Sequence, residues 1–156
     1  MHEIPSEKDS AQGASPLGLG AMGIQHVTIH VSDVARARRF YGQVLGLTEV
    51  PRPSWFDFKG AWFVVGQQQI HLVHSDPLPP RTREHFCIQV ADLIAAEKHL
   101  ESHGVARRPD RDIAGVRRFI IYDPDKNYVE IAEISQPWPT QWPAEPLPEY
   151  MRAALE

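Results

Sequence analysis

The chain has 156 residues, and 16 Lys and Arg against 20 Asp and Glu give it a formal net charge of −4. This length suits one domain with a hydrophobic core, and 42% hydrophobic with 23% charged residues excludes a wholly disordered chain. A mildly acidic chain without a basic block argues against nucleic acid as a partner, because neutralising phosphates requires clustered Lys and Arg.

The sequence also argues against membrane insertion and export. It has no apolar run near the roughly 18 residues of a membrane span. Its N-terminus lacks the basic and then apolar pattern of a signal peptide. We therefore expect a cytoplasmic protein with no membrane partner. Its single cysteine, Cys87, can form neither an internal disulfide nor a thiolate zinc cage.

The two ends of the chain differ from its middle. Residues 1–22 are rich in Ser, Gly, Ala and Pro, which predicts a flexible leader. Residues 136–156 combine tryptophans with repeated prolines, which excludes a central strand or a long helix there. We expect this tail to lie on an apolar surface and to end in a short helix. A single domain is predicted over residues 23–135.

The middle of the chain repeats itself. A shift of 59 residues carries His26 onto His85 and Asp33 onto Asp92, and it superposes several apolar positions as well. The Pro-rich stretch from Asp76 to Arg83 separates the two copies. We therefore predict two related modules, residues 23–75 and 84–135.

The elements of the two modules follow the same order. In the first, a strand that starts near His26 leads to an N-cap at Asp33, a helix over residues 34–45 that ends before Gly46, and strands at 47–52, 61–65 and 69–74. In the second, a strand from His85 leads to an N-cap at Asp92, a helix that ends before Gly104, and strands at 105–108, 117–122 and 128–134. Each module is thus predicted as βαβββ.

Ligand-type side chains stand at equivalent places in the two modules. His26 and His85 open the first strands, on the face opposite the apolar one. The shift of 59 also places His71 over Glu130, each inside the last strand of its module. An approximate twofold would bring all four side chains around one point. Three imidazoles and a carboxylate suit a divalent transition metal.

Taken singly, each of these residues also has an ordinary structural explanation. A strand histidine is more often hydrogen-bonded or half-exposed than a metal ligand, and the recurrence at both pairs of positions favours the metal site. His30 and His74 break the pattern, and we expect His30 near the cavity and His74 facing away from it. Cys87 is expected to pack as a small buried residue.

The sequence resembles the vicinal oxygen chelate superfamily, which includes glyoxalases, bleomycin-resistance proteins and extradiol dioxygenases. The likeness covers residues 24–134 and depends on His26, His85, the helix end Arg39–Leu47, and the turn from Asp123 to Asn127 ahead of Glu130. It implies an α+β fold in which two paired βαβββ modules form an open cup-like mixed sheet around a metal. It also implies a homodimer whose sites combine modules from two chains.

The likeness to the glyoxalase I branch is incomplete. That branch reads His, Glu, His, Glu at the four ligand positions, whereas this chain has His71 at the second, and Lys126 stands where the turn usually has glycine. Methylmalonyl-CoA epimerases, fosfomycin-resistance enzymes and extradiol dioxygenases keep the other three positions and vary the second. The metal site is therefore expected, and the reaction is left open.

The expected function is that of a metal-dependent lyase or isomerase resembling glyoxalase I. The metal would be Zn, Ni, Fe(II), Mn or Co, and it would bind a small-molecule substrate through adjacent oxygens. Glu130 and His71 are the candidate bases, and the resemblance suggests glutathione or another thiol as cosubstrate. The alternatives are a ring-cleaving dioxygenase using His26, His85 and Glu130, a fosfomycin-resistance-like transferase, and a non-catalytic drug- or metabolite-binding protein.

Substrate recognition is predicted from an aromatic cluster and from arginines. Trp55, Phe58 and Trp62 are expected to wall the cup, although core packing explains many such residues without a ligand. Arg52 and Arg118 would hold an anionic group of the substrate.

Overall fold

The computed structural model describes residues 21–110, 112 and 115–135. Most of the predicted leader and the whole predicted tail lie outside these residues. Within the described part of the chain, no helix has the length and apolar character needed to cross a membrane.

The first module is one four-stranded sheet with a helical segment on one face. Its strands are β1 (His26–Val31), β2 (Thr48–Val50), β3 (Gly60–Val65) and β4 (Gln68–His74), in the order β1-β4-β3-β2. The helical segment consists of α1 (Val34–Arg38) and the π-helix η1 (Arg39–Val44). Strand β1 runs parallel to β4, and the other pairs are antiparallel.

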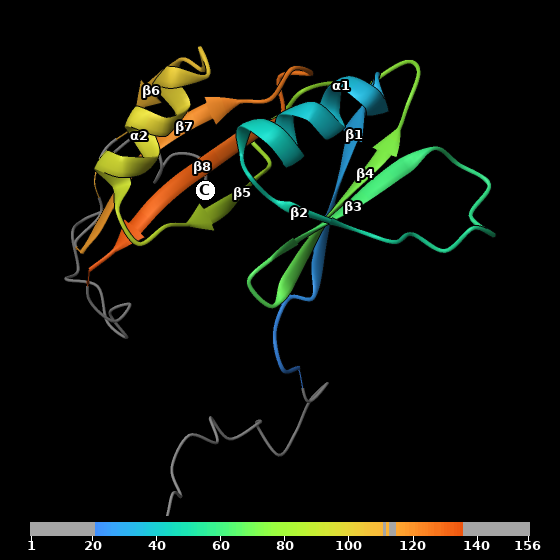
Figure 1. Ribbon diagram of the computed structural model, residues 1–156, viewed down its shortest axis with the longest axis horizontal. Coiled ribbons are helices and arrows are strands. Elements are labelled where there is room, and N and C mark those ends of the chain that lie inside the picture. The colour runs from blue at the N-terminus through green and yellow to red at the C-terminus, as the bar shows by residue number, and fades with distance from the viewer. Residues whose placement is uncertain (1–20, 111, 113–114, 136–156) are drawn as a thin grey trace, which may run out of the picture.

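The second module repeats this arrangement. Its strands are β5 (His85–Gln89), β6 (Arg107–Pro109), β7 (Val116–Tyr122) and β8 (Tyr128–Ile134), in the equivalent order β5-β8-β7-β6, with α2 (Leu93–Ser102) as its helix. Figure 1 shows the sheets on either side of the molecule, with α1 and α2 on the same upper side. The predicted pair of βαβββ modules and the α+β class are confirmed.

Strand register reproduces the shift of 59 residues. Thr28 on β1 stands opposite His71 on β4, and Cys87 on β5 stands opposite Glu130 on β8. Each of the second pair lies 59 positions after its counterpart in the first. The repeat therefore places His71 and Glu130 at equivalent points of the two sheets.

The ends of the helices follow local sequence signals. The Asp33 carboxylate accepts a hydrogen bond from Arg36 N, and the Asp92 carboxylate accepts bonds from Ile94 N and Ala95 N, as N-caps do. Gly46 and Gly104 both have φ of 71°, the left-handed conformation that ends a helix cheaply only at glycine.

The helix predicted as continuous over residues 34–45 instead widens into the π-helix η1. Leu45 N donates to Phe40 O at 2.9 Å, a bond that spans five residues. The wider turn places two consecutive aromatic side chains, Phe40 and Tyr41, inside the core. The 3.6-residue period assumed from the sequence cannot represent this local change of pitch.

One hydrophobic core runs through both modules. Phe40, Phe63 and Leu72 of the first belong to the same buried cluster as Leu100 and Ile131 of the second. Val27 and Ile29 of β1 pack against this cluster, whereas His26, Thr28 and His30 on the other face are exposed. The alternation predicted for β1 is confirmed, and it turns the ligand-type residues away from the core.

A buried carboxylate joins the two modules. Asp123, in the turn between β7 and β8, is 2% exposed. Its Oδ2 accepts hydrogen bonds from Tyr41 Oη of η1 at 3.0 Å and from Asn127 Nδ2 at 2.6 Å. Its Oδ1 accepts bonds from the backbone N–H groups of Asp125 and Asn127 at 2.9 and 2.7 Å. The turn is thus closed on itself and tied to the other module.

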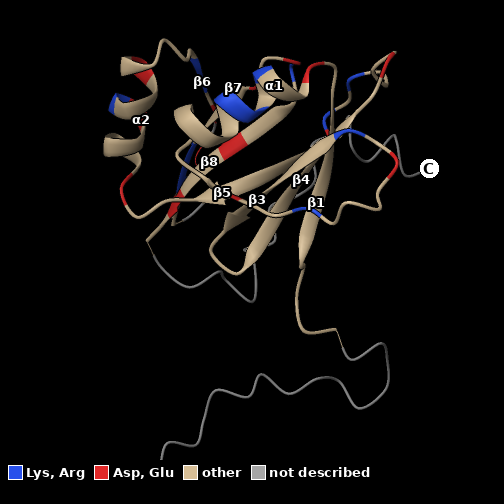
Figure 2. Cartoon of the chain, turned by 45° about the vertical axis from the view of Figure 1, so that its right-hand side comes forward, with Lys and Arg blue, Asp and Glu red and all other residues tan. Residues whose placement is uncertain are grey.

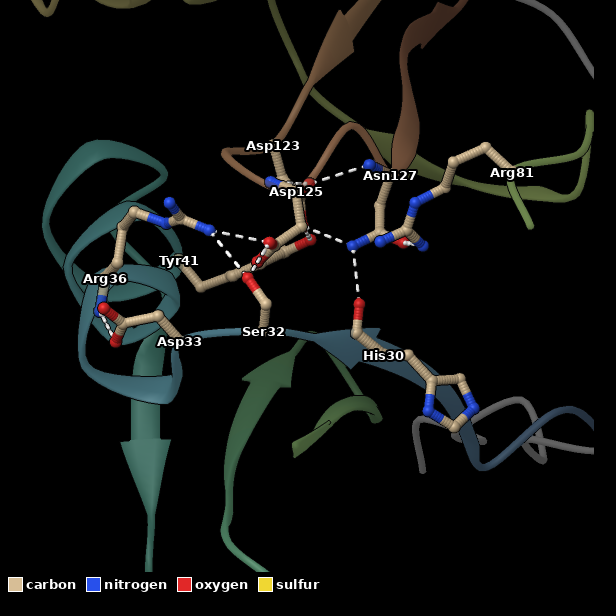
Figure 3. Close-up of polar contacts among 9 residues, drawn as sticks. All are labelled: His30, Ser32, Asp33, Arg36, Tyr41, Arg81, Asp123, Asp125 and Asn127. Carbon is tan, nitrogen blue, oxygen red and sulfur yellow. Dashed lines mark hydrogen bonds and ion pairs between the residues drawn. The ribbon is translucent and has the colours of Figure 1, made fainter. Parts of the chain in front are cut away.

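Three further hydrogen bonds complete this inter-module clamp, which we define as Ser32, Arg36, Tyr41, Asp123, Asp125 and Asn127 (Figure 3). Asp125 Oδ1 accepts bonds from Ser32 Oγ at 2.5 Å and from the Arg36 guanidinium at 2.6 Å. Asn127 Nδ2 also donates to the backbone oxygen of His30 at 3.0 Å. The end of β1, the start of α1 and the second-module turn are therefore held as one unit.

Burial shifts the pKa of two clamp residues. Burial raises the pKa of the Asp123 carboxyl, against the opposing effect of its hydrogen-bond donors, led by Asn127. Burial and the nearby Asp123 charge raise the pKa of Tyr41 well above its usual value, so Tyr41 remains a donor. Because the folded-state pKa of Asp123 is raised, ionisation of this group lowers stability as pH rises through that pKa.

We predict that Asp123→Ala lowers the free energy of unfolding by about 2–5 kcal/mol, because several buried donors lose their acceptor. Tyr41→Phe removes one bond to a charged acceptor and should cost about 2 kcal/mol. Urea denaturation measures both. Asp57→Ala, at an exposed loop position, serves as a control that should stay within about 0.5 kcal/mol of the parent. Equal stability of Asp123→Ala and this control would contradict the clamp.

Candidate functional site

On the first sheet, the two predicted ligand histidines lie face to face. The His26 and His71 rings stack with centroids 4.2 Å apart, and Trp62 of β3 stacks on the other side of His71 at 4.1 Å. His71 is therefore the middle ring of a three-ring column. Its burial lowers the pKa of the His71 imidazole, and the neighbouring His26 lowers it further.

The column borders a hollow of about 590 Å³, the first hollow. Its walls are mainly aromatic and imidazole side chains from β1, β3, β4 and the loop before β3. The lining includes His26, Thr28, Phe56, Phe58, Trp62, Gln69, His71 and Val73.

On the second sheet, the other two predicted ligands are in direct contact. His85 Nε2 lies 3.2 Å from Glu130 Oε2. The same carboxylate oxygen accepts a hydrogen bond from Arg118 Nη1 at 3.1 Å, and Arg118 also pairs with Asp110 at 3.4 Å. Glu130 is only 7% exposed, so a cation and an imidazole surround a largely buried carboxylate.

This pair borders a second hollow of about 320 Å³, lined by Arg83, His85, Arg108, Asp110, Arg118, Tyr128 and Glu130. Its chemistry contrasts with that of the first hollow. Figure 2 shows β1, β3 and β4 without charged residues, whereas charged residues lie on β6, β7 and β8. Aromatic rings and imidazoles line most of the first hollow, and ionic groups line most of the second.

Each of the three imidazoles has one nitrogen held by an oxygen acceptor. His26 Nδ1 contacts Gln25 Oε1 at 2.6 Å, and His85 Nδ1 contacts the backbone oxygen of Arg83 at 2.7 Å. His71 Nε2 contacts Gln69 Oε1 at 2.8 Å. In His26 and His71, the tautomer that donates to the glutamine oxygen has its lone pair on the opposite ring nitrogen. In His85 the opposite nitrogen, Nε2, already contacts Glu130 Oε2. Histidines that bind metals are oriented in the same way.

The four candidate ligands form two pairs and do not meet at one point of the chain. Among residues 21–110, 112 and 115–135, no three His, Cys, Asp or Glu side chains come close enough to hold a metal ion. The expectation that the internal twofold gathers all four within a single chain is therefore wrong for the described residues. The ligand assignment itself stays a prediction.

Residues 23–131 match the family model described as the glyoxalase/bleomycin resistance protein/dioxygenase superfamily. This match covers most of the chain. The protein belongs to that superfamily. The resemblance found in the helix end and the Asp123–Asn127 turn is thus confirmed.

Comparisons with individual proteins agree with this membership. The uncharacterized protein YaeR of Escherichia coli K12 is 34% identical over 128 residues, which cover 74% of this chain and 98% of YaeR. A solved structure from Bacillus anthracis, assigned to the glyoxalase family, is 30% identical with a TM-score of 0.69, covering 73% of this chain and 96% of that one.

Two solved enzymes share the fold at lower identity. A mutant of the fosfomycin resistance protein FosX from Listeria monocytogenes, complexed with Mn(II) and 1S,2S-dihydroxypropylphosphonic acid, is 22% identical with a TM-score of 0.63, over 72% of this chain and 92% of that one. Lactoylglutathione lyase from Agrobacterium tumefaciens is 23% identical with a TM-score of 0.60, over 72% and 94%.

The predicted substrate-binding residues do not all lie in the same place. Phe58 and Trp62 line the first hollow, and Arg118 lines the second, where it already pairs with Glu130. Trp55 is 79% exposed and does not line the first hollow, so its predicted place in the wall is not observed. Its neighbour Phe56 takes that place.

Arg52 has a different position from the one predicted. Its guanidinium lies over the Phe56 and Phe58 rings at 5.0 and 4.5 Å from their centroids and donates to the backbone oxygen of Phe58. It borders a separate hollow with Lys59 and His74. Arg52 thus stabilises the loop before β3, since its cation–π contacts fix the Phe56 and Phe58 rings.

Sequence reasoning missed several residues that line the two hollows. Gln69 and Tyr128 each stand two positions before a candidate ligand, His71 and Glu130, and so share its face of the strand. That period-two spacing could have identified both. Arg83 and Arg108 reach the second hollow from a linker and an edge strand, where spacing carries no such signal.

Cys87 is exposed, contrary to the expected burial of its side chain. It lies opposite Glu130 in the β5–β8 register. Partial desolvation, followed by the nearby Glu130 carboxylate, raises the pKa of the Cys87 thiol to about 12. The thiol is therefore protonated at neutral pH.

We predict slow alkylation of Cys87 by iodoacetamide. At pH 8 the native chain should react about a hundredfold to a thousandfold more slowly than the urea-unfolded chain, because the thiolate is the nucleophile. Glu130→Gln removes a negative charge and so lowers the thiol pKa, which should speed the native reaction. Mass spectrometry of quenched samples measures the rates. A native rate equal to the unfolded rate would contradict the shift.

Proposed function

We propose that the protein is a metal-dependent enzyme, a lyase or isomerase resembling glyoxalase I, and that its site forms between two chains. The His26–His71 pair of one protomer would face the His85–Glu130 pair of its partner. The observation that carries this proposal is that His26 and His71 each have one ring nitrogen held by a glutamine oxygen and the opposite nitrogen left to bind, while His85 Nε2 and Glu130 Oε2 lie 3.2 Å apart.

The donor set fits a divalent transition metal. Three imidazole nitrogens and one carboxylate oxygen match the ligands that zinc, nickel, cobalt, manganese and ferrous iron accept in proteins. The carbonyl of Arg83 behind His85, and the amides of Gln25 and Gln69 behind His26 and His71, supply the outer contacts that orient ligating imidazoles.

A dimer explains why one chain carries two half-sites. A twofold axis that brings the first sheet of one protomer to the second sheet of the other would create two equivalent sites at once. Each site would then combine the aromatic first hollow with the ionic second hollow. A small substrate would meet apolar walls on one side and arginines on the other.

Within such a site, the chain's own residues would move the proton. When bound, a divalent ion polarises the neighbouring oxygens of a substrate and so acidifies the adjacent carbon. Glu130 would accept that proton, and His71 Nδ1 is the alternative base only in a site where it is not itself a metal ligand. Arg118, which already contacts Glu130, would fix the carboxylate and bind negative charge on the substrate.

The packing of His71 favours a lyase or isomerase over a ring-cleaving dioxygenase. An iron triad of His26, His85 and Glu130 would require His71 to leave the site. Its ring lies between Trp62 and His26 and is bonded to Gln69. That packing opposes such a movement.

We predict that two inactive variants restore each other when mixed. The double variant His26→Ala/His71→Ala and the double variant His85→Ala/Glu130→Ala should each bind no transition metal, as measured by plasma mass spectrometry. Co-refolded in equal amounts, they should recover about a quarter of the parent metal content, because half the dimers are mixed and each mixed dimer has one intact site.

This mixing experiment tests the ligand assignment and the shared site separately. Metal bound by either double variant alone at the parent level would refute the ligand assignment. No recovery on mixing, in a chain that is dimeric, would refute the shared site. His103→Ala, on an exposed histidine beyond both hollows, is the matched control and should keep full metal content.

The reaction class is tested with three substrates. We expect isomerisation of a thiol hemithioacetal, no oxygen uptake with catechol, and no thiol transfer to fosfomycin. His71→Glu restores the His, Glu, His, Glu pattern and should raise the hemithioacetal rate. Oxygen uptake with catechol would instead support the dioxygenase.

A further inference from the structure

A third cavity, of about 530 Å³, lies at the seam between the modules. Residues 27–30 of β1 form one wall, and residues 84–86 at the start of β5 form another. The linker at 79–82 and the turn at 126–128 complete the lining. It borders both hollows through Thr28, His85 and Tyr128 and is formed within one chain.

Two cations line this cavity, and the clamp anchors one of them. Arg81 Nη1 donates to Asn127 Oδ1 at 2.7 Å, and Asn127 in turn donates to the buried Asp123 at 2.6 Å (Figure 3). A guanidinium has five N–H donors, and Asn127 takes one of them. Arg81 is therefore held in place with further donors to offer a ligand.

The second cation, Lys126, stands at a backbone position that favours glycine. Lys126 has φ of 67°, a conformation that glycine adopts at lower cost than lysine does. Lys126 N donates to Asp123 O at 2.9 Å, so the turn itself needs the backbone of this residue and not its side chain. An ammonium kept at a strained position beside a cavity points to a role for that charge.

The rest of the lining gives the cavity two kinds of wall. Val27, Ile29 and Phe86 supply apolar surface, and Pro79 and Pro80 add to it. Glu84 is the one carboxylate among the residues that line the cavity, against Arg81 and Lys126. The volume falls within the range of pockets that bind small molecules, about 300–1,000 Å³.

We propose that this seam cavity binds a small organic anion. Its carboxylate or phosphate group lies between Arg81 and Lys126, and its apolar body lies against Val27, Ile29 and Phe86. This site needs neither a metal ion nor a second protomer, so it is independent of the function proposed above.

The test measures binding of three probes to the full chain in the presence of a chelator. Benzoate, phenyl phosphate and the neutral benzyl alcohol share one ring and differ in charge. Calorimetry should give measurable affinity for an anionic probe, and amide shifts in NMR should map to residues 27–30, 79–86 and 126–128. The preferred anion identifies the carboxylate or phosphate class.

Lys126→Gly is the decisive variant because it removes the charge while relieving the turn. It should raise the thermal midpoint and weaken the anionic probe about tenfold, one charge-assisted contact. Arg81→Gln should weaken it similarly, and Lys98→Gln, on exposed α2 away from the cavity, should leave it unchanged.

Three results would overturn the proposal. These are equal affinity for benzyl alcohol and both anions, unchanged anion affinity in Lys126→Gly, and amide shifts confined to the first or second hollow. Because a chelator is present throughout, none of these results depends on the metal site.

Discussion

The buried carboxylate of Asp123 is the constraint on which the relation between the two modules depends. It closes the turn before β8 and receives the Tyr41 hydroxyl from the other module, while Asp125 and Asn127 extend the contact to α1 and β1. A buried anion with several donors is costly to disturb, so this contact fixes geometry as well as adding stability. It also joins the two most recognisable sequence motifs, the helix end and the Asp-Pro-Asp turn.

The clamp and the shared core hold the two sheets so that their ligand faces do not converge within one chain. Each sheet carries one pair of candidate ligands in a different setting: stacked rings surround His71 on one, and an ionic cluster surrounds Glu130 on the other. A pair of residues that offers only two ligands would hold a metal weakly, since protein metal sites usually supply three or four. Under the proposed function, a dimer would join the two pairs of candidate ligands into one site.

The repeat made most of the fold predictable. A shift of 59 residues, capping aspartates and alternating strands were enough to predict the βαβββ succession of elements in both modules and to pair His71 with Glu130. The π-helix was missed because burial of Phe40 and Tyr41 together, and not local propensity, sets its pitch. The separation of the two ligand pairs was missed because strand patterns show which face a residue uses and carry no information on how two sheets are oriented. Trp55 and Arg52 were misplaced for a related reason: their loop is organised by the contact of Arg52 with Phe56 and Phe58.

Strands β1, β3 and β4 carry no charged residue, whereas β6, β7 and β8 do, and this contrast indicates how such a protein could evolve. If the two modules arose by duplication of one ancestral unit, both have kept the same strand order. Their side chains have diverged: the first hollow is mainly aromatic, and the second contains ion pairs. Substitutions on β3 and the loop before it could then alter the apolar side of the pocket without disturbing the arginines on the opposite half. Substrate specificity could therefore change through the first module while the second module kept its arginines.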